Sequence, residues 1–417
     1  MCRERWAALA LGSWLLAQPA RGDTIDFEAT TLLAGRADPR DGQLHTVVPM
    51  LETVSGRASA IKNPWLCDLE VVLQMWGEID PGDPRDDRFS SGDVDLGYAA
   101  ATLARGRVAL RAGRQLIQGG AARMLQLDGG NVQVRVRRFG LQGFAGVPVT
   151  PRFGVDRGDG AAGARVSYRA SFESELGLSF IHVADDGRVA RQDLAVDGRW
   201  APHRSLLMSG LVLWSIAEER LAELDTRFSL IPSSKLELSV DVRRTAPDLF
   251  LPLNSIFAVF AEERRDEVGS TLVLSASPAL RLQADYHALG QDSGTGHRAG
   301  GKLTLMPGRA RRGSVGVQSR VLRLPDHDGY TELRLFGALP LGATGFVTGD
   351  VAGYLLEAPI NGQDGSLSGQ VSAGRGFGRW RGVVSGLAAV TPFAERHFEV
   401  MARLVYGFST RIREDRP

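Results

Sequence analysis

The chain has 417 residues, which is enough for two or three soluble domains or for one large barrel. Lysine and arginine together number 49 and aspartate and glutamate 48, so no excess of charge points to nucleic acid as a partner. Only three of the basic residues are lysines, Lys62, Lys235 and Lys302.

The first 22 residues have the features of an export signal. Arg3 and Arg5 precede the apolar stretch 6–17, which is too short to span a bilayer, and small residues follow it. A short buried helix could give the same pattern. We predict cleavage before Asp23, after which Cys67 is the single remaining cysteine and no internal disulfide can form.

Beyond this signal, most segments alternate between apolar and polar residues with a period of two, as β-strands with two different faces do. In residues 131–138, one face carries three valines and the other carries polar and basic residues. The apolar face, which we expect to meet lipid, comprises Val132, Val134 and Val136; the polar face comprises Asn131, Gln133, Arg135 and Arg137. Similar segments, each about nine to twelve residues long, have the length of tilted transmembrane strands.

The connections between these segments alternate in length. Tight ones are expected at 232–234, 277–278 and 341–342, and longer polar ones at 80–93, 290–298, 324–329 and 358–366. The region 245–267 breaks the rhythm and is either a long loop or an irregular strand. We therefore predict an all-β fold: an up-and-down antiparallel transmembrane β-barrel of roughly 18 to 22 strands.

This barrel is predicted to form one domain over residues 23–408 in the outer membrane, followed by a polar tail at 409–417. A soluble sandwich or propeller would show the same alternation, with its apolar face buried. The export signal and the strand length favour the membrane barrel.

The last predicted strand, 397–408, carries alternating apolar residues and ends in Tyr406 and Phe408. A terminal strand that ends in aromatic residues resembles the assembly signal of outer-membrane barrels, which implies recognition by the barrel-assembly machinery. Here the polar tail follows Phe408, whereas the usual pattern ends at the aromatic residue.

Residues 110–138 contain the ordered elements Gly113-Arg114-Gln115, Gly119-Gly120, Arg123 and Asp128-Gly129. This spacing resembles a strand–loop–strand segment of porin-like outer-membrane channels, including alginate-export and exopolysaccharide-secretion barrels. The resemblance implies arginines that line the lumen, at Arg111, Arg114, Arg123, Arg135 and Arg137. They could form one positive patch that selects an anionic solute, or they could pair with carboxylates such as Asp128 and fill the barrel.

Enzyme motifs are poor. The seven histidines are scattered, and no HExxH, GxSxG, P-loop or Cys/His cluster occurs. The stretch 294–300, "GTGHRAG", leads into a strand and so lacks the helix that a dinucleotide loop needs. A lipase-like Ser/His pair on the exterior, using His287 or His397, is a minor alternative. The acidic loop 80–95 lacks the spacing of a calcium-binding loop. Since none of these motifs is present, we expect no catalysis, no cofactor and no metal.

The predicted function is a porin-like conduit for a polar or anionic solute, with polysaccharide export as one route. There are two alternatives: a structural or adhesive surface barrel with a plugged lumen, and a secreted soluble β-protein. The expected partners are outer-membrane lipid, the barrel-assembly machinery and periplasmic polysaccharide-export components, without nucleic acid.

Overall fold

The computed structural model describes residues 24–40, 43–60, 66–79, 90–149, 159–246, 264–307, 313–325 and 328–411. The predicted signal at 1–22 lies outside these residues. So do most of the acidic loop, most of the irregular region 245–267, and the last six residues of the predicted tail.

The described chain is almost entirely strand, in agreement with the period-two alternation of its sequence. The strands are β1 (Thr24–Arg40), β2 (Gln43–Val47), β3 (Met50–Ala60), β4 (Leu66–Ile79), β5 (Ser90–Leu103), β6 (Val108–Gln118), β7 (Met124–Val136), β8 (Phe139–Pro148), β9 (Gly160–Ser171), β10 (Ser174–Asp185), β11 (Arg188–His203) and β12 (Leu206–Ser215). They continue with β13 (Arg220–Ser233), β14 (Leu236–Thr245), β15 (Arg265–Ser277), β16 (Leu280–Gln291), β17 (Gly294–Leu305), β18 (Ser314–Arg323), β19 (Tyr330–Leu341), β20 (Gly345–Ile360), β21 (Gln363–Phe377), β22 (Trp380–Thr391) and β23 (Ala394–Arg411). A short 3₁₀ turn, η1 (Gly120–Ala122), joins β6 to β7. Among the described residues, no helix is long and apolar enough to cross a membrane.

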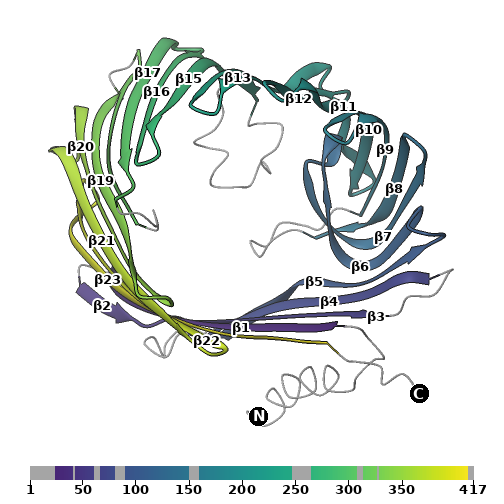
Figure 1. The fold of residues 1–417 in the computed structure, drawn as a ribbon, viewed down its shortest axis with the longest axis horizontal. Coiled ribbons are helices and arrows are strands. Elements are labelled where there is room, and N and C mark those ends of the chain that lie inside the picture. Colours follow the sequence, from purple (N-terminus) through teal and green to yellow (C-terminus); the bar gives the residue numbers. More distant parts are fainter. Residues whose placement is uncertain are drawn as a thin grey trace.

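The strands form one closed ring. From β3 to β23 each strand pairs antiparallel with the next along the chain, and β1 pairs with both β3 and β23, which closes a barrel of 22 strands. Within the described ranges, strand β2 pairs with the far end of β1 and with no other strand. Figure 1 shows the ring, with the seam where the first and last strands meet. The predicted up-and-down barrel is confirmed, at the upper end of the expected strand number.

The barrel exterior is apolar because successive side chains of a strand point to opposite faces. On β11, for example, Leu194 and Val196 are 41% and 44% exposed, whereas Ala195 and Asp193 on the other face are 1% and 2% exposed. Exposed leucines, valines and aromatic residues recur in this way around the ring. A closed ladder pairs the backbone groups of each strand internally, as a hydrocarbon environment requires.

The two ends of the barrel differ. Two-residue turns such as 172–173, 204–205 and 378–379 lie at the end where β1 begins and β23 finishes. The strand ends that flank residues 80–89 and 247–263 lie at the other end, together with some two-residue turns such as 186–187. Short turns are typical of the periplasmic side of outer-membrane barrels, and long loops of the extracellular side. We name the two ends accordingly.

Three sequence-based boundaries were wrong. Residues 290–298 and 358–366 were predicted to be long loops, but β16, β17, β20 and β21 extend across them and leave only two-residue turns. At 361–362 both residues have positive φ, +50° and +76°, which suits an Asn-Gly hairpin turn. The closing strand β23 also continues to Arg411 instead of ending at 408, since Ser409 pairs with Asp26 of β1.

Candidate functional site: the barrel interior

One hairpin leaves the wall and folds into the barrel. Strands β6 and β7 bend where Gly113 and Gly129 are paired, and Gly113 has a φ of +117°. A Cβ at Gly113 would lie 2.2 Å from the carbonyl oxygen of Gly97, and one at Gly129 would lie 2.1 Å from that of Ala145. Neighbouring backbones therefore approach so closely at this corner that only glycine fits.

Beyond the corner, the apolar side chains change faces. In the wall, Leu110 and Val132 point outward and are 38% and 45% exposed. Past the glycines, the opposite face becomes apolar: Ile117 and Leu127 are 2% and 0% exposed. This face packs against side chains from the interior wall in a core of Ile117, Ala121, Ala122, Leu127, Phe144, Ala161, Ile181, Ala195, Leu213 and Ala222. In Figure 1 the hairpin runs to β10 and β11 from inside the ring.

Polar contacts fix the tip of the hairpin to the wall. The backbone N–H of Ala121 donates to Ser179 Oγ at 2.8 Å, and Arg191 Nη2 donates to the carbonyl oxygen of Ala121 at 2.8 Å. Arg123 Nε lies 2.8 Å from the Glu223 carboxylate on β13. We call these three contacts the latch.

Of the predicted lumen arginines, three lie on the hairpin and each has a partner. Arg114 contacts Asp128 through both carboxylate oxygens, at 2.8 and 2.9 Å, and also contacts Asp93 at 3.0 Å. The guanidinium of Arg111 lies over the ring of Tyr98, 4.5 Å from its centroid, and Arg123 belongs to the latch. The expected pairing with a carboxylate on a neighbouring strand is therefore present at Arg114, whereas Arg123 pairs with Glu223 of the distant strand β13.

The single positive patch, one of the two alternatives for these arginines, stays a prediction, and the register spreads its members along the wall. Arg111 is paired with Asn131, and four residues along β7 separate Asn131 from Arg135, about 13 Å, which exceeds the Debye length of about 8 Å at physiological salt. Arg137 does not project from a strand, because β7 ends at Val136 and Arg137 occupies the next turn with a φ of +55°. Arg135 and Arg137 instead line a small recess near the periplasmic end, together with Arg165, Arg169 and Glu175.

The three valines of β7 lie on the exterior face. Val132 and Val136 are 45% and 56% exposed, and Val134 between them is partly covered. Asn131, on the interior face, is 4% exposed. These exposures agree with the predicted lipid-facing and polar faces in this part of the wall.

Most of the interior wall is a lattice of ion pairs between strands. Arg165 contacts Asp197 at 2.6 Å and Glu175 at 3.1 Å. Two guanidinium nitrogens of Arg334, Nε and Nη2, donate to the two carboxylate oxygens of Asp350. Further interior pairs are Arg243–Asp225, Arg298–Glu267 and Arg320–Glu332. Such a wall is polar and charged, yet largely neutralised pair by pair.

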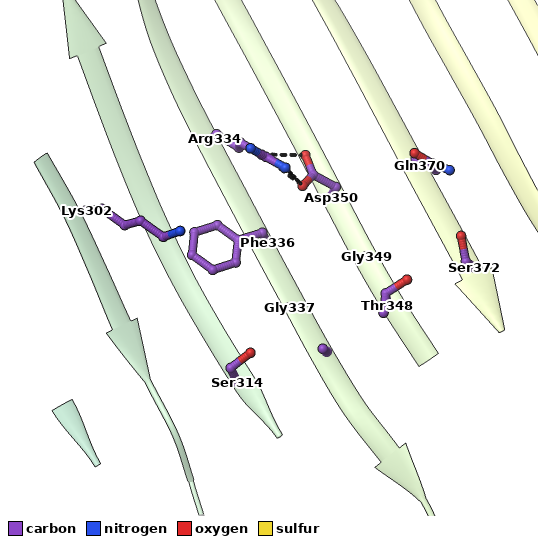
Figure 2. A pocket seen from close by; sticks show the side chains of 11 residues that line it. Lys302, Ser314, Arg334, Phe336, Gly337, Thr348, Gly349, Asp350, Gln370 and Ser372 are labelled. Carbon is purple, nitrogen blue, oxygen red and sulfur yellow. Dashed lines mark hydrogen bonds and ion pairs between the residues drawn. The ribbon is translucent and has the colours of Figure 1, made fainter. Parts of the chain in front are cut away.

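A recess in the wall of β17–β21 contains a cation outside such a pair. It has a volume of about 320 Å³ and is lined by Lys302, Ser314, Arg334, Phe336, Gly337, Ala338, Thr348, Gly349, Asp350, Gln370 and Ser372. The ammonium of Lys302 lies 4.6 Å from the centroid of Phe336 (Figure 2), and among the described residues no carboxylate lies within ion-pair distance of it. Sequence reasoning missed this site, although Lys302 is one of only three lysines.

The predicted assembly residues lie at the seam of the barrel. Phe408 is paired with Phe27 of β1, with ring centroids 5.6 Å apart, and Tyr406 contacts Trp380 of β22 at 4.6 Å. This aromatic cluster joins the first strand to the last two near the periplasmic end. Aromatic residues at that height are typical of the membrane interface of such barrels.

A closed antiparallel barrel with an apolar exterior and a charged interior defines a transmembrane β-barrel of the outer-membrane type. The predicted porin-like outer-membrane fold and location are thereby confirmed. No family model matches the sequence, and no curated protein matches it.

Solved structures resemble it in fold. The translocation pore of the P pilus usher PapC has a TM-score of 0.50 at 10% identity, covering 92% of this chain and 99% of its own. OccAB4 of Acinetobacter baumannii has a TM-score of 0.45 at 6% identity, covering 95% of this chain and 100% of its own. OpdK of Pseudomonas aeruginosa, solved with vanillate, has a TM-score of 0.44 at 12% identity, covering 93% and 98%. At these identities the likeness concerns the fold alone.

Proposed function

We propose that the protein is an outer-membrane channel for a polar, anionic solute, and that the recess around Lys302 holds that solute in transit. The observation that carries this proposal is the ammonium of Lys302, which has no carboxylate within ion-pair distance among the described residues and lies beside the neutralised Arg334–Asp350 pair. Barrels of this strand number are wide enough to hold an interior lumen, which here is lined by charged groups.

The chemistry of the recess suits an anion that carries hydroxyl groups. Arg334 and Asp350 neutralise each other, so Lys302 leaves the recess with a net positive charge. Thr348, Gln370 and Ser372 add donors and acceptors that a hydroxylated solute can use (Figure 2). A fixed cation on a polar wall raises the local concentration of anions, as in other selective pores.

Acidic saccharides combine a carboxylate with hydroxyl groups and are the solute class that we favour. Polysaccharide export, together with periplasmic export components, remains a proposal that rests on the resemblance of residues 110–138 to such barrels. Import of a small acidic solute would use the same recess.

The test is planar-bilayer recording in a salt gradient with wild type, Lys302→Gln and Lys235→Gln. Lys235 is an exposed residue of the β13–β14 turn at the periplasmic rim. The Lys235→Gln variant therefore removes one positive charge, as Lys302→Gln does, but at a position far from the recess. We expect wild type and Lys235→Gln to prefer anions, and Lys302→Gln to shift its reversal potential toward cations. The shift should shrink as the salt concentration rises.

Equal reversal potentials for the two lysine variants would contradict the role of the recess. No conductance from wild-type protein that shows the heat-modifiable gel mobility of a closed barrel would contradict the channel itself. That result would favour the plugged structural barrel, since the β6–β7 hairpin already occupies part of the interior.

A further inference from the structure

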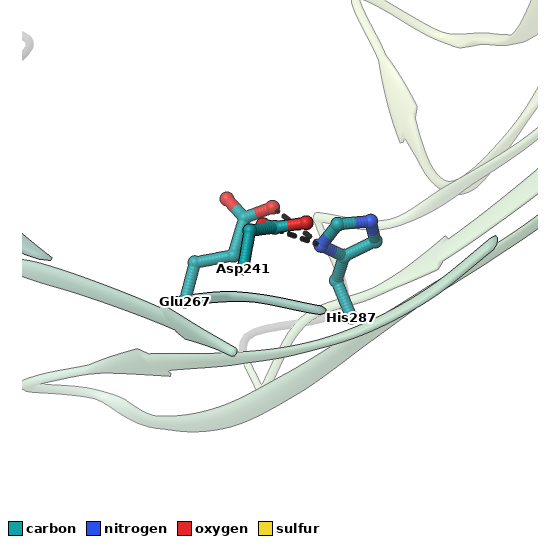
Figure 3. A group of neighbouring side chains, drawn as sticks. All are labelled: Asp241, Glu267 and His287. Atoms are coloured by element: carbon teal, nitrogen blue, oxygen red, sulfur yellow. Dashed lines mark ion pairs between the residues drawn. The ribbon is translucent and has the colours of Figure 1, made fainter. Parts of the chain in front are cut away.

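Three residues on neighbouring strands converge on one point of the interior wall, away from both the recess and the hairpin. Asp241 of β14, Glu267 of β15 and His287 of β16 bring one ligand atom each to within 4.8 Å of one another. All three are buried, with exposures of 5%, 7% and 7%. Figure 3 shows both carboxylates beside the same ring nitrogen of His287.

A glycine between them makes this convergence possible. Gly269 pairs with Asp241 on one side and with His287 on the other, and Glu267, two residues along β15 from Gly269, lies on the same face of the sheet. The imidazole lies over Gly269, where a Cβ would be only 1.9 Å from Nδ1. Any larger residue at 269 would displace the ring from the two carboxylates.

The geometry is that of ligands, and it does not fit a hydrogen-bonded ion pair. His287 Nδ1 lies 2.9 Å from Glu267 Oε1 and 3.7 Å from Asp241 Oδ2. Even so, Nδ1 has no hydrogen-bond partner among the described residues, because the nearer carboxylate oxygen lies off the direction of a ring N–H. Two ligand atoms on one tetrahedral Zn²⁺ are about 3.4 Å apart, given bonds of about 2.0–2.2 Å, and the two distances bracket this value.

We propose that Asp241, Glu267 and His287 form a binding site for a divalent transition-metal ion such as Zn²⁺ on the interior wall of the barrel. One imidazole and two carboxylates suit zinc and its neighbours better than Ca²⁺, which takes oxygen ligands. Arg298, 2.6 Å from Glu267 Oε1, orients that carboxylate from the next strand. Bound metal would link β14, β15 and β16 across the wall.

No pattern in the sequence indicates this site. Its members are separated by 26 and 20 positions in the sequence, and no local motif contains two of them. We expected no metal, and only strand pairing brings the three residues together. The proposal does not depend on the channel function.

The experiment measures Zn²⁺ binding to detergent-solubilised, chelator-treated protein by titration calorimetry, with metal content checked by mass spectrometry. The variants are His287→Gln, Gly269→Ala and, as a matched control, His397→Gln, whose histidine lies 3.7 Å from Glu399 at a more exposed position. We expect one Zn²⁺ per wild-type chain and per His397→Gln chain. His287→Gln should bind at least about a hundredfold more weakly, because losing a ligand should exceed the 10- to 100-fold effect of losing an outer partner.

Gly269→Ala is the most informative variant because it keeps all three ligands and removes only the space for the ring. It should also lose Zn²⁺ binding, and Co²⁺ added as a spectroscopic probe should lose the visible bands that it shows in wild type. Heat-modifiable gel mobility identifies the variants that fold. If His287→Gln does not fold, the Zn²⁺ binding of Gly269→Ala tests the proposal.

Wild type without Zn²⁺ binding would overturn the proposal. Equal binding by wild type and by folded Gly269→Ala would also overturn it, since the metal would then be held elsewhere. Ca²⁺ binding as tight as that of Zn²⁺, unaffected in His287→Gln, would indicate a carboxylate site without the histidine, which contradicts the proposed ligand set.

Discussion

Loosening the latch should release the β6–β7 hairpin from the wall without unfolding the barrel. Ser179→Ala leaves the buried N–H of Ala121 without its acceptor, at a cost of about 1–3 kcal/mol. Glu223→Gln weakens the charged contact with Arg123, which is worth about 1.5–3 kcal/mol when intact. If the two effects add, the double variant should shift the equilibrium between docked and undocked hairpin by roughly 2.5–6 kcal/mol.

Such a change multiplies the undocked fraction by roughly a hundredfold to ten-thousandfold, since every 1.4 kcal/mol is a factor of ten. The apolar contacts of Ile117 and Leu127 still favour docking, so the hairpin should open transiently. Trypsin cleavage after Arg123, in the tip, should accelerate accordingly, because cleavage follows the open population. Single-channel current should become noisier, with brief openings to higher conductance.

Ser239→Ala is the control for the latch. Ser239 is a buried serine of the interior wall, 8% exposed, on β14, a strand with no extensive contact to η1. It should leave both cleavage and current as in wild type. A folded Ser179→Ala/Glu223→Gln double variant with unchanged cleavage and unchanged current would refute the reasoning and show that the apolar core alone holds the hairpin.

Two further predictions concern the membrane and assembly. Val132→Arg should lower the free energy of unfolding by about 2–4 kcal/mol if the residue lies near the bilayer midplane, whereas Gln133→Arg on the interior face should be nearly neutral. Equal stability of the two variants in a lipid folding assay would argue against the lipid-facing assignment. Tyr406→Ala with Phe408→Ala should lower outer-membrane levels, as quantified by cell fractionation, because it removes the aromatic contacts at the seam. Truncation after Arg411 should preserve those levels, since β23 then remains whole; normal insertion of the double variant would exclude these residues as the assembly signal.

The architecture of the barrel was predictable because it depends on a local pattern. Alternation along each strand determines which face is apolar, and strand length distinguishes a membrane wall from a typical soluble sheet. The pattern is weakest at turns, where Gly, Asn and Asp suit both tight turns and long loops. For this reason 290–298 and 358–366 were assigned as loops, although Asn361 and Gly362 form a two-residue turn.

The candidate sites were harder to predict because their residues meet only through the closed ring. Arg123 lies 100 positions from its partner Glu223, and no local pattern relates the two. Arg111 and Arg135 seemed to be neighbours on adjacent strands, but the register places Arg111 opposite Asn131. Because the sequence does not specify the register, it could not show how far apart these two cations lie.

One signal for the hairpin was nevertheless present in the sequence. The large apolar residues of 108–112, Val108 and Leu110, occupy even positions, whereas beyond Gly113 the buried Ile117 is odd; on β7, Leu125 and Leu127 are odd before Gly129, and the valines after it are even. A shift of the alternation by one residue moves the apolar side chains to the other face of a strand. Here β6 and β7 both shift at the paired glycines Gly113 and Gly129, so the environment of each face of the hairpin changes at that point. The face that met lipid turns toward the interior, and the face that lined the interior becomes buried. A paired phase change of this kind therefore predicts a hairpin that leaves the wall and folds inward.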